Sequence, residues 1–212
     1  MPSRPQLQVA IGTVIIVWAI LLFVSGVTLK PSYLKPLSLA ISIAYFVLLA
    51  FDRWLWRIPF VSRMLHCPVL RGTWKGQLQS NWIDPSTNEA AAAVDVFLVI
   101  RQTYSTISMR MLTKESASRS LVASLQAPRD DVARASSTYQ SVPRLLIQDR
   151  SRIHHGALML EVEGSPGNRL TGSYWTDRDT KGEVLLSARL PKPYTSFDEA
   201  SAGKWPTDAV VP

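Results

Sequence analysis

The hydrophobic pattern of this chain changes near Leu65, and this change constrains the fold more than any other feature. Beyond that point apolar and polar residues alternate, and turn-forming residues interrupt the alternation about every ten positions. Side chains of a β-strand point alternately to its two faces, so the pattern predicts short strands. We expect eight strands, at residues 73–82, 93–102, 104–112, 119–126, 135–141, 155–163, 169–177 and 183–190.

The links between these segments are of hairpin length and leave no room for a crossover helix. Consecutive strands are therefore expected to pair antiparallel. Eight strands are enough to close a small sheet on itself, and closure removes the exposed sheet edges. The pattern thus predicts an all-β, eight-stranded antiparallel up-and-down β-barrel.

Two apolar runs precede the alternating region. The first, residues 7–29, contains no charge over 23 positions, and a helix of that length rises about 34 Å, enough to cross a bilayer core. The second, residues 37–51, is shorter and needs its flanks, so its helix is expected at about residues 35–54. The linker KPSYLKP contains two prolines, which break helices. The N-terminus is therefore expected to form an α-helical transmembrane hairpin over residues 1–63.

Most of the positive charge lies beside these apolar runs. Residues 1–63 carry six Lys or Arg and one Asp, a net charge of +5, whereas the rest of the chain carries 17 basic and 15 acidic residues, only +2. Four arginines lie on the side of the two hairpin ends and two lysines lie in the turn, so the positive-inside rule favours a cytoplasmic N-terminus and a cytoplasmic barrel. This distribution argues for membrane topology and against binding of a DNA or RNA polymer.

Residues for catalysis or metal binding are not grouped as those functions require. His154 and His155 are adjacent, so they point to opposite faces of a strand, and the single cysteine, Cys67, has no histidine at ligand spacing. Asp177 and Asp179 flank Arg178 in a sequence typical of a charged hairpin turn. We therefore expect no enzymatic activity, no metal and no cofactor.

The alternating region does carry groups suited to a small anionic ligand that contains bases. Arginine binds phosphate through its planar fork, hydroxyl groups form hydrogen bonds, and aromatic rings stack on bases. Periodicity alone leaves open whether the polar faces of the strands point to solvent or to a wet cavity. The candidate ligand-binding residues are Arg101, Tyr104, Arg110, Ser116, Ser118, Tyr139, Tyr174, Thr176 and Arg178.

The order of these features resembles a known family. Two N-terminal apolar helices and a short basic connector are followed by LRGTWKGQLQSNW, by IRQT with a serine-rich stretch, and by GSYWTDRDTKG. This arrangement resembles the two-transmembrane, β-strand-rich effectors of CBASS antiphage defence, which are associated with bacterial cGAS-like nucleotidyltransferases.

The resemblance implies a non-enzymatic receptor in the bacterial inner membrane. Its barrel, residues 66–190, would be a ligand-sensing domain that binds a cyclic dinucleotide or related cyclic oligonucleotide made by a nucleotidyltransferase partner. The protein would then form homo-oligomers, and its helices would disrupt the lipid bilayer and cause abortive infection. The C-terminal residues 191–212 lie outside the resemblance and are expected to form a flexible tail.

Two alternatives remain open. The G-x-W sequence that ends at Trp74, followed by an eight-stranded meander, also resembles lipocalins, in which this tryptophan closes the barrel end against an arginine of a late strand; here Arg189 is the candidate for this structural plug. A lipocalin-like architecture implies a membrane-anchored carrier or sensor of an apolar small molecule. The other alternative is a membrane-anchored scaffold without a ligand.

Overall fold

The computed structural model describes residues 12, 15–20, 23–24, 31–83, 88–128, 132–149, 151–164 and 167–206, and it describes no side chains for residues 31–41. The chain forms two compact units, one of Met1–Val61 with Thr103–Thr106 and one of Ser62–Gln102 with Ile107–Pro212. The helix expected at residues 7–29 lies mostly outside the described residues.

The first unit contains helix α2 (Pro31–Arg53) and the short 3₁₀-helix η1 (Leu55–Arg57); the six-residue helix α3 (Pro59–Met64) follows. The turn Thr103–Thr106 also belongs to this unit. Its Tyr104 ring packs edge-on against Phe51 with the ring centroids 5.2 Å apart, and the Ser105 backbone N–H donates to Asp52 Oδ1 over 2.9 Å. Among the described residues, no helix combines the length and the apolar character that a membrane span requires.

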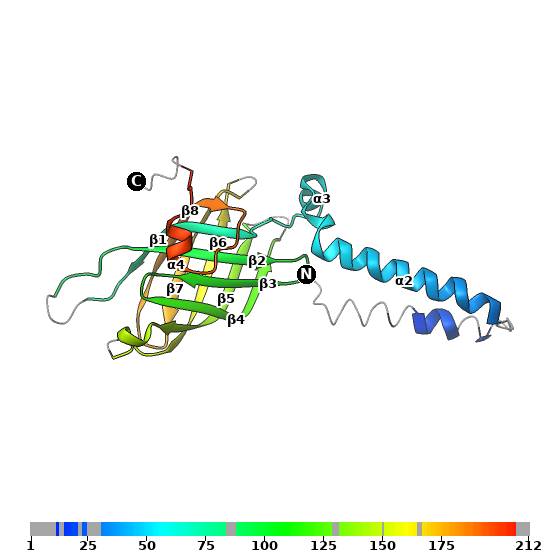
Figure 1. The fold of residues 1–212 in the computed structure, drawn as a ribbon, viewed down its shortest axis with the longest axis horizontal. Helices are drawn as coiled ribbons and strands as arrows, with labels where there is room; N and C mark the ends of the chain where they lie inside the picture. The colour runs from blue at the N-terminus through cyan, green and yellow to red at the C-terminus, as the bar shows by residue number, and fades with distance from the viewer. Residues whose placement is uncertain are drawn as a thin grey trace. The chain divides into compact units, whose positions relative to one another are not determined.

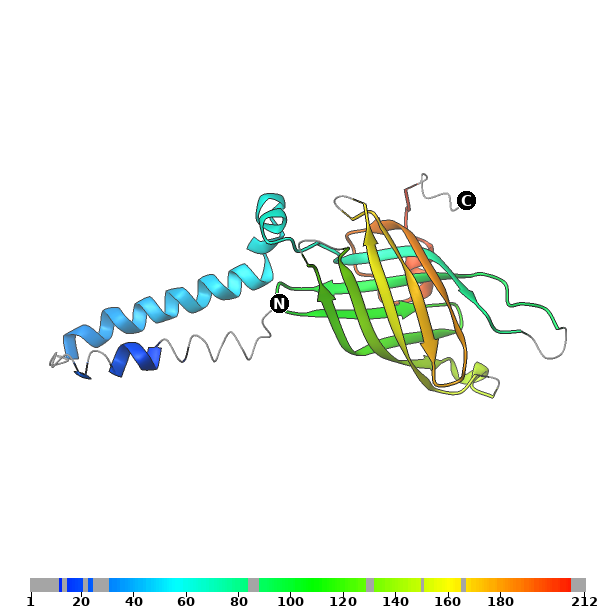
Figure 2. The same cartoon turned by 180° about the vertical axis from the view of Figure 1, so that it is seen from behind.

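The second unit is a closed antiparallel barrel in which each strand pairs with the next and the last pairs with the first, which confirms the predicted up-and-down topology (Figures 1 and 2). The strands are β1 (Gly72–Ser80), β2 (Val94–Gln102), β3 (Ile107–Leu112), β4 (Ser116–Gln126), β5 (Arg134–Pro143), β6 (His154–Glu163), β7 (Arg169–Thr176) and β8 (Lys181–Leu190).

Two strand boundaries differ from the prediction by three residues, for local reasons. Strand β3 begins at Ile107 and not at Tyr104, because the Thr103 backbone N–H donates to Thr106 O over 2.8 Å and closes a turn. Strand β4 begins at Ser116, three residues early, because the Thr113 backbone N–H donates to Ser116 O over 2.9 Å and makes the β3–β4 link a tight hairpin. In both turns a threonine hydroxyl adds a further bond, because Thr103 Oγ1 accepts from the Thr106 backbone N–H and Thr113 Oγ1 accepts from the Ser116 backbone N–H.

Two irregularities interrupt the strand ladders of the barrel, one at the β1–β8 closure and one between β4 and β5. The β1–β8 register shifts between Lys75 and Gly76, and the β4–β5 register shifts between Ser120 and Val122. An extra residue on one strand of a pair increases the local twist, which small barrels need in order to close. Elsewhere the alternation continues without a break, so each strand keeps one face inside and one outside.

The barrel interior is divided into an apolar half and a polar half. The apolar half lies where β1 begins, and its fully buried side chains include Trp74, Leu98, Ile100, Leu160, Leu170 and Leu186. The polar half lies where β1 ends and contains hydroxyl groups and two tyrosines. Burial of the apolar side chains supplies the main driving force for closing the sheet. The polar residues of the other half are therefore not needed for closure.

The C-terminal segment, expected as a flexible tail, contains a helix in its described part and packs on the barrel there. Residues 191–206, here called the strap, include helix α4 (Phe197–Ser201) and cover the outer face of β2 (Figure 1). The Phe97 ring stacks on Trp205 at 5.4 Å and meets Phe197 edge-on at 5.2 Å. Thr73 joins the strap to β1, because its Oγ1 donates to Lys192 O and accepts from the Tyr194 backbone N–H.

Glu199 is expected to make the attachment of the strap pH-dependent. Its carboxylate bonds Lys192 Nζ at 2.8 Å and accepts from the Thr195 backbone N–H, and these contacts lower the pKa of Glu199 from 4.5 to about 2. A carboxyl whose folded-state pKa is depressed stabilises the fold above its unfolded pKa and loses that contribution as the pH falls toward the folded value. The protection factors of the strap amides, which compare their exchange with that of an unstructured peptide at the same pH, should therefore fall between about pH 4.5 and pH 2 in the wild type. The Glu199→Gln variant should exchange faster at pH 7 and show no such transition, and an identical pH profile for both proteins would contradict this role.

Candidate ligand-binding site

A cavity opens at one end of the barrel, where the β1–β2, β3–β4, β5–β6 and β7–β8 hairpins meet. Its volume is about 580 Å³, within the range of about 300–1,000 Å³ usual for small-molecule sites. The views from both sides place the β1–β2 hairpin and the short helix η2 (Leu145–Ile147) at this same end (Figures 1 and 2). We call this space the mouth cavity.

Six of the nine ligand-binding residues expected from the sequence line the mouth cavity. Ser116 and Ser118 come from β4, Tyr139 from β5, Tyr174 and Thr176 from β7, and Arg178 from the turn that follows. Every second residue of a strand points into the barrel, and these residues occupy such inward positions near the same barrel end. Their side chains therefore lie close together. Aromatic rings, hydroxyl groups and a guanidinium group thus face a common space.

The two tyrosines lie along the cavity wall, each over a glycine of a neighbouring strand. A Cβ at Gly156 on β6 would come within 2.6 Å of the Tyr139 hydroxyl oxygen, and a Cβ at Gly182 on β8 would come within 2.8 Å of a Tyr174 ring carbon. A residue other than glycine at either position would push the ring into the cavity. Because glycine has no side chain, the rings of Tyr139 and Tyr174 stay against the wall, and the space in front of them stays open.

Both hydroxyl groups are kept in their neutral form. Burial, with smaller contributions from Tyr174 and Asp177, raises the pKa of Tyr139 to about 12, and burial also raises the pKa of Tyr174. A neutral phenol donates a hydrogen bond and adds no negative charge. The wall of the mouth cavity can therefore accept an anionic ligand without repelling it.

Arg178 is held at the rim by a network of turn contacts. Its Nη1 donates to Ser151 Oγ at 3.0 Å, and its backbone N–H donates to Thr176 Oγ1 at 3.2 Å. The neighbouring Asp177 accepts from the His155 backbone N–H at 3.0 Å, and this bond is the main cause that lowers the pKa of Asp177. The turn is therefore fixed on both sides, which positions the exposed guanidinium group beside the cavity opening.

Three expected ligand-binding residues lie elsewhere. Arg101 and Arg110 share strand parity with Phe97 and Leu112, which pack under the strap, so both arginines point outward from the barrel. Tyr104 belongs to the other compact unit. The structure therefore does not bring Arg101, Tyr104 or Arg110 to the mouth cavity.

The mouth cavity also contains residues that the sequence analysis did not select. Trp82 comes from the β1–β2 hairpin, Lys114 from the β3–β4 hairpin and His154 from the start of β6. His154 has the same parity as Gly156 and Leu158, so a strand starting at residue 154 would have identified it. Trp82 and Lys114 lie in links, where periodicity gives no information about direction.

The opposite end of the barrel is closed by the two residues expected to plug it. Trp74 is fully buried, its Nε1 donates to Leu70 O at 2.9 Å, and the Arg189 guanidinium lies 5.3 Å from the ring centroid. Arg189 also donates Nε and Nη2 to Arg71 O, at 3.2 and 2.8 Å. Gln102 completes this closure by accepting from the Leu70 backbone N–H at 2.7 Å. A ligand in the barrel therefore has its opening at the mouth.

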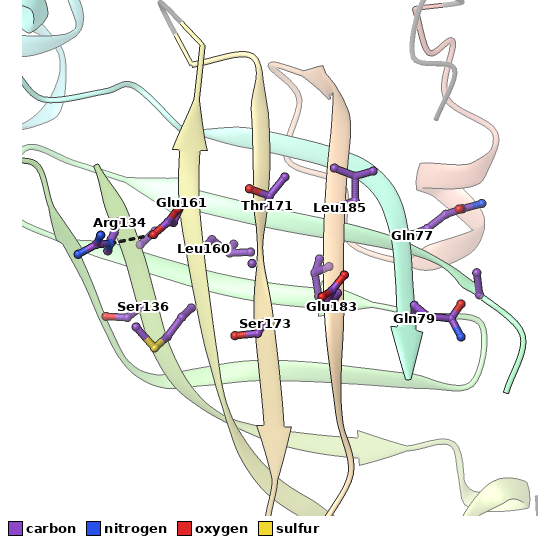
Figure 3. A pocket seen from close by; sticks show the side chains of 15 residues that line it. Gln77, Gln79, Arg134, Ser136, Leu160, Glu161, Thr171, Ser173, Glu183 and Leu185 are labelled. Carbon is purple, nitrogen blue, oxygen red and sulfur yellow. Dashed lines mark hydrogen bonds and ion pairs between the residues drawn. The ribbon is translucent and has the colours of Figure 1, made fainter. Parts of the chain in front are cut away.

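A second hollow, of about 640 Å³, lies on the outer surface over β1 and β5–β8 (Figure 3). Arg134 there donates to Glu161 at 3.0 Å, and Glu183 faces the same hollow. None of the 15 described residues that line it is aromatic. The outer hollow has two carboxylates for one arginine and no ring for a base, whereas the mouth cavity has one carboxylate, Glu115, for Lys114 and Arg178, and it has aromatic rings. The mouth cavity is therefore the better site for a nucleotide.

Comparison with known proteins points to the same domain. The family model of the Cap15 cyclic dinucleotide receptor domain matches residues 65–188. The chain is also similar to CD-NTase-associated protein 15 from Staphylococcus schleiferi, with 22% identity over 172 residues that cover 81% of this chain and 89% of the relative. The matched range contains every residue that lines the mouth cavity, whereas Arg189 and the strap lie beyond it.

Proposed function

Because this chain belongs to the Cap15 cyclic dinucleotide receptor domain family, we propose that its mouth cavity binds a cyclic dinucleotide or a related cyclic oligonucleotide. The observation that carries the proposal is the meeting of Tyr139, Tyr174 and Arg178 at one cavity of suitable size. These residues come from separate strands and turns, so their meeting follows from the closed barrel.

The chemistry of the cavity suits both parts of such a ligand. Bases stack on the rings of Tyr139 and Tyr174, each at the cost of little side-chain freedom because the rings are already held against the wall. Phosphates meet the guanidinium of Arg178 and the ammonium of Lys114 at the rim. Serine and threonine hydroxyls between them bond sugar and phosphate oxygens.

The proposal extends to a membrane effector of CBASS defence. The relative from Staphylococcus schleiferi is named for its association with a CD-NTase, which supports a nucleotidyltransferase as the functional partner that makes the ligand. The apolar runs at residues 7–29 and 37–51 and the +5 charge of residues 1–63 support two helices in a bacterial inner membrane, with the barrel in the cytoplasm. Ligand binding then promotes homo-oligomers, whose helices disrupt the bilayer and cause abortive infection.

Calorimetry of the full chain in detergent against a panel of cyclic di- and trinucleotides tests this function. We expect one of them to bind, and we expect Arg178→Ala to weaken it roughly 10- to 100-fold, since hydrogen bonds to charged groups contribute about 1.5–3 kcal/mol. Arg110→Ala is the matched control, because it removes the same side chain from the outer surface and should bind like the wild type.

The outcomes separate function from site. If no cyclic nucleotide binds the wild type, the sensor function is wrong. If Arg110→Ala weakens binding and Arg178→Ala does not, the ligand binds the outer surface and not the mouth cavity. Fatty acids or lipids retained in native mass spectra of the purified protein would instead favour the lipocalin-like carrier.

A further inference from the structure

Three arginines form a row on the outer face of β2–β4. Arg110 on β3 lies directly opposite Arg119 on β4, and Arg101 on β2 lies on the same face, opposite Ser108. Within the described part of the chain, none of the three arginines has an ion-pair partner. We call these residues the arginine row.

Such a row is unfavourable for the barrel alone. Arg110 and Arg119 lie directly across an antiparallel pair, where like charges repel each other. A nearby negative charge would favour the charged form of both guanidinium groups. The repulsion is relieved when an anion or an anionic surface lies against this face. The row therefore indicates a negatively charged partner outside the chain.

The register shift in β4 places apolar side chains beside the arginine row. Between Ser120 and Val122 the strand holds one extra residue, and the consecutive side chains of Leu121 and Val122 are 62% and 69% exposed. A bulge on a barrel wall redirects side chains in this way. The face thus combines three cationic groups with two exposed branched apolar groups.

The apolar pair lies at the middle of β4, on the side of Arg119 that faces the plugged end of the barrel. Strand β4 runs from the mouth at Ser116 to that end at Gln126, and β1 starts there at Gly72. Only residues 62–71 separate β1 from residues 1–61, which carry the proposed membrane helices. A tether of ten residues holds the barrel at high local concentration near whatever surface those helices occupy.

We infer that the arginine row with Leu121 and Val122 docks on the anionic phospholipid headgroups of the bilayer. Guanidinium forks bind headgroup phosphates, each basic side chain is attracted to an anionic leaflet, and the apolar pair reaches the boundary of the acyl chains. A purely acidic protein partner would leave the apolar pair unexplained. This inference rests on the membrane step of the proposed function and is independent of which nucleotide is sensed.

Fluorescence quenching of the full chain in lipid nanodiscs tests this docking. With the buried Cys67 replaced by serine, a bimane label is attached through Leu121→Cys, or through Ser173→Cys on the outer face of β7 as the matched control. In nanodiscs that contain phosphatidylglycerol and a headgroup spin label, we expect quenching at position 121 to exceed that at position 173 several-fold. The double variant Arg110→Ser with Arg119→Ser, nanodiscs of phosphatidylcholine alone, or high salt should each remove the difference.

Equal quenching at the two positions, or quenching that persists in the double variant, would overturn the inference. Energy transfer between labels at position 121 of two chains, without lipid quenching, would also overturn it and assign this face to a second copy. If the chain does not incorporate into nanodiscs, the membrane step of the proposed function fails, and the docking fails with it. Calorimetry on the same preparation reports separately whether the nucleotide binds.

Discussion

Replacing Trp74 with alanine should lower the free energy of unfolding by about 3–5 kcal/mol, the usual cost of removing a fully buried tryptophan. The change opens a cavity at the plugged end, leaves Leu70 O without its side-chain donor, and removes the ring beneath Arg189. For a domain of this size each kcal/mol corresponds to about 2–4 °C, so the Tm should fall by roughly 6–20 °C. Thermal unfolding followed by circular dichroism measures the change.

Trp175→Ala is the matched control for this prediction. Trp175 lies on the outer face of β7 and is 47% exposed, so the same substitution should change stability by about 0.5 kcal/mol or less. If the two variants unfold at the same temperature, Trp74 does not stabilise the barrel end as described. A loss of nucleotide binding in Trp74→Ala without a loss of stability would instead place the ligand at that end.

Removing both cavity tyrosines, Tyr139→Ala with Tyr174→Ala, should weaken binding of the cyclic nucleotide on the order of 100-fold or more, since stacking contributes about 1–3 kcal/mol for each base. Each tyrosine side chain lies close to a glycine of the neighbouring strand, so alanine removes a ring that is already held at the cavity wall. Calorimetry with the cyclic nucleotide that binds the wild type measures the loss.

The double phenylalanine variant distinguishes stacking from folding. Tyr139→Phe with Tyr174→Phe keeps both rings and removes only the hydroxyl groups, so its affinity should stay within a few-fold of the wild type. Circular dichroism should show the same strand content for all three proteins. If the phenylalanine variant loses as much affinity as the alanine variant, the hydroxyl groups and not the rings hold the ligand.

The alternation along the chain was sufficient to predict the barrel, because closure and pairing order depend on parity and link length. It did not decide which polar positions face a cavity. On β3 the polar face with Ser108 and Arg110 is the outer one, whereas on β7 the face with Tyr174 and Thr176 lines the mouth cavity. Polar residues are suited both to a water-filled interior and to bulk solvent. Only the strand register of the closed barrel therefore shows which polar residues face inward.

The strap shows a different limit of sequence reasoning. Its aromatic residues Tyr194, Phe197 and Trp205 follow neither a helical nor a strand period, and proline and glycine flank them, so the segment is typical of a flexible terminus. Their partners Phe97 and Val99 lie about one hundred residues earlier. A contact of such long range leaves no local pattern, although the unusual outward-facing Phe97 on β2 was a sign that something covers that face.

The two ends of the barrel differ in what they allow over evolutionary time. Four hairpins surround the opening, while the tryptophan, the arginine and the glutamine that seal the far end lie on strands or beside them. Loops accept insertions and exchanges more readily than packed strand positions do. The four hairpins at the rim of the mouth cavity can therefore change without disturbing the sealed end, whereas the tyrosines on β5 and β7 can change only within the packed strands.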